Sequence, residues 1–250
     1  MNNKVYFIGI GPGSPDLLTL RAYHIICRAK VIIYPGSLIS SEMIDFLKKE
    51  NPHAELYDAY GKSLSQIIEK IENALNKNQT VARLVSGDPS LYSSIMEHIE
   101  ILREKNYPYE IIPGISSVFA ASSKLGIEFT YPNLSHTLIL TRFEGKTGGA
   151  TEKEILTFLQ TKSTLVFFLS SGLKDKLYNT LKKILPLDTK VAILYKLTHP
   201  EEKIFITTLE NLPKTMEENN INKSALIVVG DILNLIDKNF YKRSILYAEK

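Results

Sequence analysis

Residues 4–15 are KVYFIGIGPGSP, an apolar stretch that runs directly into a loop of glycine and proline. Apolar residues bounded by turn residues predict a short buried strand, here Lys4 to Gly9. The loop GIGPGSP, residues 9–15, precedes a helix that we expect Asp16 to cap and that extends to about Ala29. A strand, a glycine loop and a helix in this order predict an α/β fold. Taken alone, the loop is as consistent with a tight turn as with a ligand site.

The rest of the first half also alternates between strand and helix patterns. Further strands are predicted at Val31 to Tyr34, Thr80 to Val85 and Tyr109 to Ile112. Ser63 and Gln66 have the spacing of a capping box, and apolar residues at helical spacing follow them, so we expect a helix there. This alternation is typical of an α/β domain with a mainly parallel sheet.

The pattern changes after Pro113. A helix rich in small residues is expected at Ser116 to Leu125, and the short stretch Lys196 to Glu202 is expected to join two strands as a hairpin. The strands are expected at residues 136–141, 164–169, 191–195, 203–208 and 225–229, and two further helices at residues 151–160 and 173–184. We therefore expect an N-terminal α/β domain of residues 1–113 and a C-terminal mixed α/β domain of residues 114–250.

The composition excludes several classes of protein. A chain of 250 residues can form one or two domains with ordinary hydrophobic cores. The 30 Lys and Arg residues against 27 Asp and Glu are interleaved, which predicts no nucleic-acid partner. Cys27 is the single cysteine, so one chain cannot form a disulfide. Neither a membrane-spanning apolar run nor a signal-peptide pattern is present, so we expect a cytoplasmic protein without a membrane segment.

The common catalytic and nucleotide-binding motifs are incomplete. Ser14 stands where a dinucleotide-binding loop needs its third glycine, and Tyr34-Pro35 stand where that motif needs an acid. Gly61-Lys62-Ser63 and Gly145-Lys146-Thr147 resemble the end of a P-loop but lack the glycine five positions earlier. The histidines have no metal-ligand spacing, and no serine lies in a GxSxG motif, so we expect neither a metal site nor a serine hydrolase.

Three further segments rich in Gly, Pro and Ser follow predicted strands. They are Ser86 to Tyr92 (SGDPSLY), Pro113 to Ser117 (PGISS) and Tyr195 to Lys203. Ligands of open α/β sheets bind outside the carboxyl ends of the strands. Together with residues 9–15, these segments predict a ligand cleft between the two domains, in which Asp88 could accept hydrogen bonds from a ligand.

The segments quoted so far, and others in the same order, resemble those of the tetrapyrrole methyltransferases over nearly the whole chain. The members of this family use S-adenosylmethionine, and they consist of two α/β domains with the active site in the trough between them. The resemblance therefore implies S-adenosylmethionine as the methyl donor, a small tetrapyrrole as the substrate and a homodimer. The segments that carry it are GPGSPDLLTL (11–20), RLVSGDPSLY (83–92), IIPGISSVFAA (111–121), LVFFLSS (165–171) and SALIVVGDIL (224–233).

Three other segments resemble one subgroup, the precorrin-4 and cobalt-precorrin-4 C(11)-methyltransferases of cobalamin biosynthesis. They are YPGSLIS (34–40), LTRFEGKT (140–147) and YKLTHPEEKI (195–204). Pro35 stands where the uroporphyrinogen-III methyltransferases have an aspartate. The alternatives are another corrin-ring or sirohaem-pathway C-methyltransferase, or a methyltransferase of the same fold that acts on a macromolecule.

The resemblance also implies which residues form the site, several of them through backbone groups. The cofactor contacts would be Pro12, Ser86, Gly87, Asp88, Leu91, Tyr92, Ser116, Ser117, Leu169, Leu197 and Ala225. Because a tetrapyrrole carries many carboxylates, cationic side chains are the candidate substrate contacts, namely Arg142, Lys196 and the weaker Arg21. No catalytic base can be named, and Ser14 replaces an aspartate found in many relatives. Apolar residues near the C-terminus agree with a dimer: Phe240, Tyr241, Ile245 and Leu246.

Overall fold

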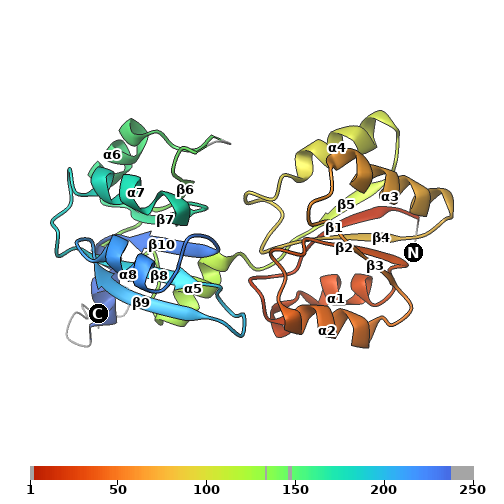
Figure 1. Ribbon diagram of the computed structural model, residues 1–250, viewed down its shortest axis with the longest axis horizontal. Coiled ribbons are helices and arrows are strands. Elements are labelled where there is room, and N and C mark those ends of the chain that lie inside the picture. Colours follow the sequence, from red (N-terminus) through yellow and green to blue (C-terminus); the bar gives the residue numbers. More distant parts are fainter. Residues whose placement is uncertain (1–2, 133, 146–147, 238–250) are drawn as a thin grey trace, which may run out of the picture. The chain divides into compact units, whose positions relative to one another are not determined.

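The computed structural model describes residues 3–132, 134–145 and 148–237, and it divides into two compact units. Unit 1 runs to Ser117 and also includes Thr198–Pro200. Unit 2 takes Val118–Leu197 and continues from Glu201. Each unit is built on its own five-stranded sheet (Figure 1). The predicted domain boundaries, residues 1–113 and 114–250, stay a prediction.

Unit 1 contains a fully parallel sheet with the strand order β3-β2-β4-β1-β5. The central strands β1 and β4 are buried along their whole length, as the apolar sequence at residues 4–9 predicts. The edge strand β3 was not predicted, because ELYD has the polar, half-exposed composition of a loop. The strands are β1 (Val5–Gly9), β2 (Val31–Tyr34), β3 (Glu55–Asp58), β4 (Val81–Val85) and β5 (Tyr109–Ile112).

Helices cover both faces of this sheet (Figure 1). Side chains alternate along each strand, so Val5 and Phe7 pack with α3 and α4, while Tyr6 and Ile8 pack with α1 and α2. The capping box of Ser63 at the start of α3 is confirmed. The helices are α1 (Leu20–Ile26), α2 (Ser41–Glu50), α3 (Leu64–Asn76) and α4 (Ile95–Glu104).

The predicted start of the first helix was wrong. Asp16 does not cap α1 but lies in a short 3₁₀ turn, Pro15–Leu17. The chain is extended at Leu18 and Thr19, and α1 begins only at Leu20, where the Thr19 hydroxyl accepts a hydrogen bond of 3.2 Å from the Ala22 backbone N–H. A threonine just before the helical residues is a good N-cap, whereas Asp16 precedes three residues that are not part of the helix.

Unit 2 contains a mixed sheet with the order β6-β7-β10-β8-β9, in which only β6 and β7 are parallel. The predicted mixed sheet and the β8–β9 hairpin are confirmed. The strands are β6 (Leu138–Arg142), β7 (Thr164–Phe168), β8 (Lys190–Tyr195), β9 (Lys203–Thr208) and β10 (Ala225–Val229). The helices are α5 (Ser117–Leu125), α6 (Glu152–Gln160), α7 (Lys174–Leu181) and α8 (Leu212–Glu218).

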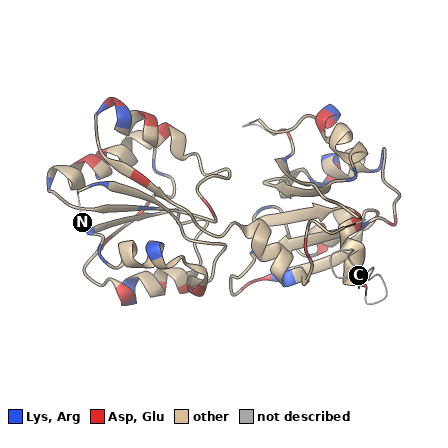
Figure 2. Ribbon diagram, turned by 180° about the vertical axis from the view of Figure 1, so that it is seen from behind, with Lys and Arg blue, Asp and Glu red and all other residues tan. Residues whose placement is uncertain are grey.

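Charged residues lie mainly on helices and loops, with Lys and Arg interspersed among Asp and Glu in each unit (Figure 2). Among the residues that the structure describes, no helix is long and apolar enough to cross a membrane.

Candidate functional site

Three glycines bring the carboxyl ends of β1, β4 and β5 together. Gly9 ends β1, Gly87 follows β4 and Gly114 follows β5. A methyl group added at Gly9 would lie 2.7 Å from the Gly87 carbonyl oxygen and 2.7 Å from the Gly114 nitrogen. One added at Gly114 would lie 2.3 Å from the same carbonyl oxygen. Only glycine fits at such distances, so main-chain groups of three loops meet at this edge of the sheet.

The loop of residues 9–15 and the loop of residues 86–92 are also joined by hydrogen bonds. The Gly11 N–H donates to the Gly87 carbonyl at 3.2 Å, and the Gly87 N–H donates back to the Gly11 carbonyl at 2.8 Å. The Ile10 N–H donates to the Val85 carbonyl at 3.0 Å. Two segments selected from the sequence as ligand loops are therefore neighbours, at the edge where ligands of open α/β sheets bind.

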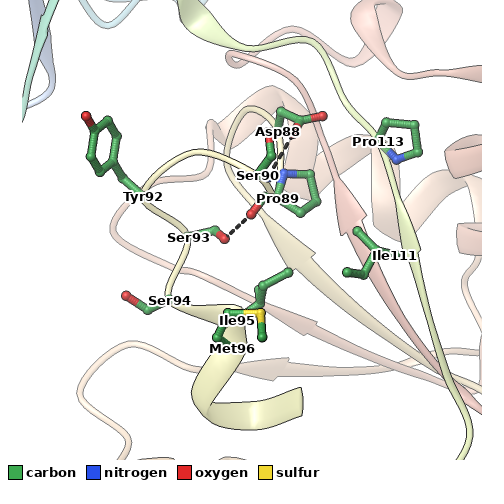
Figure 3. A pocket seen from close by; sticks show the side chains of 10 residues that line it. All are labelled: Asp88, Pro89, Ser90, Tyr92, Ser93, Ser94, Ile95, Met96, Ile111 and Pro113. Carbon is green, nitrogen blue, oxygen red and sulfur yellow. Dashed lines mark hydrogen bonds between the residues drawn. The ribbon is translucent and has the colours of Figure 1, made fainter. Parts of the chain in front are cut away.

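Asp88 braces two of these loops against each other. Its Oδ2 accepts a hydrogen bond of 2.8 Å from the Gly114 N–H. Its Oδ1 accepts hydrogen bonds from the N–H and the hydroxyl of Ser90, which lies beside it (Figure 3). Burial alone would raise the pKa of this carboxyl group, but the hydrogen bonds from Ser90 and Gly114 lower it below the ordinary value. Asp88 is therefore a fixed negative charge at neutral pH. That it also binds a ligand stays a prediction.

A cavity of about 500 Å³ lies beside Asp88, between its loop, the first turn of α4 and the end of β5 (Figure 3). Its lining is mostly apolar, and Tyr92, Met96 and Ile111 in it are well exposed. Tyr92 and Ser94 both have φ near +53°, a strained conformation for residues other than glycine, which often marks functional loops. The lining residues are Asp88, Pro89, Ser90, Tyr92, Ser93, Ser94, Ile95, Met96, Ile111 and Pro113.

All eight predicted cofactor contacts of unit 1 belong to segments that follow strands at the same edge of its sheet. Ser116 is buried, and its Cα lies 3.8 Å from the position that a Cβ of Gly87 would take. Ser117 begins α5 directly after it. Pro12 lies in the glycine loop, and its carbonyl oxygen is 3.1 Å from Nε2 of His199. The set that shares this edge of the sheet is Pro12, Ser86, Gly87, Asp88, Leu91, Tyr92, Ser116 and Ser117.

The remaining predicted cofactor contacts lie at one edge of the sheet of unit 2. Ala225 begins β10 opposite Tyr195, the last residue of β8, and Leu197 follows β8 as a buried side chain. Leu169 follows β7, with an exposed side chain and φ of 52°. The Ser171 hydroxyl donates to the Ala225 carbonyl at 3.3 Å. Apolar side chains such as these could contact a ligand through their backbone groups.

The three candidate substrate contacts have different surroundings. Arg142 is half-buried at the carboxyl end of β6. Lys196 forms a 2.9 Å ion pair with Glu201, and this hydrogen bond is the main reason that the pKa of Lys196 is raised. Arg21 is largely exposed on α1 and pairs with Glu110, which also binds Lys4 at 2.8 Å. A surface ion pair is the simpler account of Arg21.

Sequence reasoning missed the side chains that hold the glycine loop. Thr198, His199 and Ser40 all contact residues 12–14. The only sequence signal for Thr198 and His199 was that they belong to the segment Tyr195 to Lys203, which was predicted to lie near a ligand. Their partners lie more than 180 residues earlier, at a distance that no local pattern covers. Within the described residues, no group of three or more His, Cys, Asp or Glu could hold a metal ion.

This fold and this convergence of strand-end loops agree with a comparison against known families. A family model described as Tetrapyrrole (Corrin/Porphyrin) Methylases matches residues 4–213. The chain belongs to this family. The predicted family, the fold of two α/β units and the class of methyltransferase are thereby confirmed.

Individual relatives point to one subgroup. The chain is 37% identical to a cobalt-precorrin-4 C(11)-methyltransferase of Methanocaldococcus jannaschii over 97% of both chains. It is 33% identical to a precorrin-4 C(11)-methyltransferase of Pseudomonas aeruginosa over 95% of both. A solved structure of a cobalt precorrin-4 methyltransferase is 36% identical, with a TM-score of 0.86, over 92% of this chain and 96% of the other. These relatives agree with the subgroup predicted from the sequence.

Proposed function

We propose that the protein transfers a methyl group from S-adenosylmethionine to carbon 11 of cobalt-precorrin-4 or precorrin-4, in cobalamin biosynthesis. The observation that carries this proposal is the full-length similarity to relatives named for both forms of this reaction. The same similarity makes another corrin-ring or sirohaem-pathway methyltransferase the second choice. It argues most strongly against a methyltransferase that acts on a macromolecule.

The residues of unit 1 fit the proposed methyl donor. Glycines at the ends of β1, β4 and β5 allow a ligand to approach the main chain, and the adjacent cavity offers apolar surface beside one carboxylate. We propose that Pro12, Ser86, Gly87, Asp88, Leu91, Tyr92, Ser116 and Ser117 hold the cofactor there. Leu169, Leu197 and Ala225 of unit 2 are proposed contacts on the strength of the family resemblance.

When bound, S-adenosylmethionine supplies a methyl group on a positively charged sulfur. The chain needs no nucleophile of its own, because an electron-rich ring carbon of the substrate would form the new bond to the methyl group while the carbon–sulfur bond breaks and S-adenosylhomocysteine leaves. The protein has to orient the reacting atoms in line and keep water out, and such positioning can lower a barrier by about 7–11 kcal/mol. The close packing of the three glycine loops suits this task, since a loop that is already rigid loses little freedom on binding.

We propose that Arg142 and Lys196 bind carboxylates of the tetrapyrrole. Arg142 can offer two parallel N–H donors to one carboxylate, which a lysine cannot. Lys196 would exchange its partner Glu201 for a substrate carboxylate. Arg21 is the weakest candidate, because it already pairs with Glu110.

We further propose that the protein is cytoplasmic and works as a homodimer. The dimer rests on the family resemblance. The apolar residues that agree with it, Phe240, Tyr241, Ile245 and Leu246, lie outside the described residues.

One experiment tests the reaction directly. The purified protein is incubated with isotope-labelled S-adenosylmethionine and, in parallel, with precorrin-4 and cobalt-precorrin-4. We expect one labelled methyl group per product molecule by mass spectrometry, and NMR should place it on carbon 11. A methyl group on another ring carbon, or no transfer to either substrate, would refute the proposal.

A further inference from the structure

The segment Thr198–Pro200 contacts the glycine loop, although in the sequence it lies between β8 and β9. His199 Nε2 is 3.1 Å from the carbonyl oxygen of Pro12. Because a carbonyl oxygen can only accept, Nε2 carries the proton and donates it in this bond. The Thr198 hydroxyl oxygen accepts a hydrogen bond of 3.0 Å from the Ser14 N–H. Two consecutive residues therefore hold the backbone on both sides of Gly13.

The imidazole of His199 also packs directly on Gly13. A Cβ added at Gly13 would lie 2.3 Å from Cδ2 and 2.8 Å from Nε2 of His199, which is far inside van der Waals contact. A side chain at position 13 would therefore have to displace the ring, and the constraint comes from this contact and not from an unusual φ angle. Either a methyl group at position 13 or the imidazole can occupy this space, but not both.

A third side chain, that of Ser40 in the N-terminal half of the chain, holds the same loop. The Ser40 hydroxyl donates a hydrogen bond of 2.7 Å to the Gly13 carbonyl. It also accepts one of 3.0 Å from the Met43 N–H, which caps α2. Residues 12, 13 and 14 thus each have a main-chain group bound by a side chain from elsewhere, and Gly11 is bound to Gly87.

The backbone around His199 is itself strained. Thr198 has φ of 63° and Lys196 has φ of 45°, in the left-handed region that favours glycine. Non-glycine residues keep such conformations only where surrounding contacts hold them, and they cluster at functional sites. Thr198 makes contacts of this kind with the glycine loop.

We propose that His199 is a positioning residue of the methyl-transfer site: with Thr198 it fixes residues 12–14 in the conformation that binds the cofactor. This inference rests on the proposed function. In this proposal His199 acts through the Pro12 carbonyl and through the face of Gly13, and not on the reacting atoms themselves. A loop that is fixed in advance binds its ligand more tightly, because less conformational freedom is lost on binding.

Three substitutions of His199 separate its hydrogen bond from its packing. His199→Ala removes both, His199→Phe keeps a ring without a donor, and His199→Gln keeps a donor without the ring. Calorimetry with S-adenosylhomocysteine measures cofactor affinity, steady-state kinetics give kcat and KM for both substrates, and a thermal melt reports folding. His53→Ala, at an exposed position before β3, is the matched control.

We expect His199→Ala and His199→Phe to weaken S-adenosylhomocysteine binding about tenfold, as loss of one hydrogen bond predicts. His199→Gln should recover part of this loss, and His53→Ala should bind like the wild type. The Tm of all four variants should stay close to that of the wild type.

Gly13→Ala gives an independent check, because it should displace the ring and thereby mimic His199→Ala. In the His199→Ala background, Gly13→Ala should cause little further loss, so the two effects should not add. Additive losses would overturn the inference, because they would show that the ring does not act through Gly13.

The remaining outcomes also decide the question. If His199→Ala and His199→Phe bind S-adenosylhomocysteine as tightly as the wild type, the positioning role is refuted. It is also refuted if all three His199 variants lose affinity together with a fall in Tm, because the loss then reflects stability. If the wild type binds S-adenosylhomocysteine but methylates neither tetrapyrrole, the proposed function fails while the role of His199 in cofactor binding can still be confirmed.

Discussion

His98 should make this protein less stable in mild acid. It lies on α4 with only 8% of its surface exposed. Its ring packs edge-on against the ring of Phe7, with 6.1 Å between the two ring centroids. Among the described residues, neither ring nitrogen has a hydrogen-bond partner of good geometry, and a weak contact with the Ser94 backbone opposes the lowering of the pKa only in part. Burial, and then the positive charge of the buried Arg83 on β4, lower the pKa of His98 from 6.5 to about 4.

The size and direction of the effect follow from these two pKa values. Above pH 6.5 the imidazole is neutral in both the folded and the unfolded chain, so His98 adds no pH dependence. As the pH falls from 6.5 to 4, the unfolded chain binds a proton that the folded chain does not. The free energy of unfolding should therefore fall by about 3 kcal/mol in total, and by about 2 kcal/mol at pH 5.

Other groups act in a different range of pH. Hydrogen bonds lower the pKa of Asp88 and Glu154, and hydrogen bonds to lysine lower those of Glu110 and Glu152. Their contribution is lost only as the pH falls below the ordinary carboxyl values of 3.8 to 4.5. A comparison of pH 7.5 with pH 5 therefore avoids these carboxyl groups, and the variant His98→Leu separates His98 from the other four histidines.

Urea denaturation of the wild type, His98→Leu and His53→Leu at the two pH values tests this reasoning. The wild type and the exposed control His53→Leu should lose about 2 kcal/mol between pH 7.5 and pH 5. His98→Leu should lose much less, whatever its stability at pH 7.5. An equal loss in all three proteins would show that His98 is not the group that titrates.

The other predictions concern the site and the assembly. Asp88→Ala removes the acceptor of the Gly114 and Ser90 N–H groups, so S-adenosylhomocysteine affinity should fall on the order of tenfold; unchanged affinity by calorimetry would exclude Asp88 from the site. Arg142→Ala should lower kcat/KM for the tetrapyrrole by about tenfold to a hundredfold with cofactor affinity kept, since a charged hydrogen bond contributes about 1.5–3 kcal/mol. Arg142→Lys should restore only part of the activity, and joint loss of stability, cofactor binding and turnover would contradict a role in substrate binding. Light scattering at micromolar concentration should give twice the chain mass of 28.2 kDa, and a monomer would contradict the homodimer.

The sequence predicted the elements that local apolar patterns define. The strands of unit 1 that carry the site and the capping box at Ser63 were predicted, because buried strands and capped helices have distinctive compositions. The helix α2, the edge strand β3 and the short helix α8 were missed. For β3 and α8 the reason is that exposed or short elements have weak patterns. Contacts such as His199 with Pro12 depend on the fold of the whole chain, so no pattern within either segment could reveal them.

The contact between Thr198–Pro200 and the glycine loop has a consequence for folding during synthesis. All five strands of the first sheet lie between Val5 and Ile112, so this sheet can form while the second half of the chain is still being made. The glycine loop gains its contacts with Thr198 and His199 only after residue 199 has left the ribosome. A nascent or truncated chain that ends before Thr198 would therefore have a complete first sheet and a glycine loop that lacks its contacts with Thr198 and His199. The proposed site for the methyl donor would therefore be completed late in synthesis, after most of the polypeptide has been made.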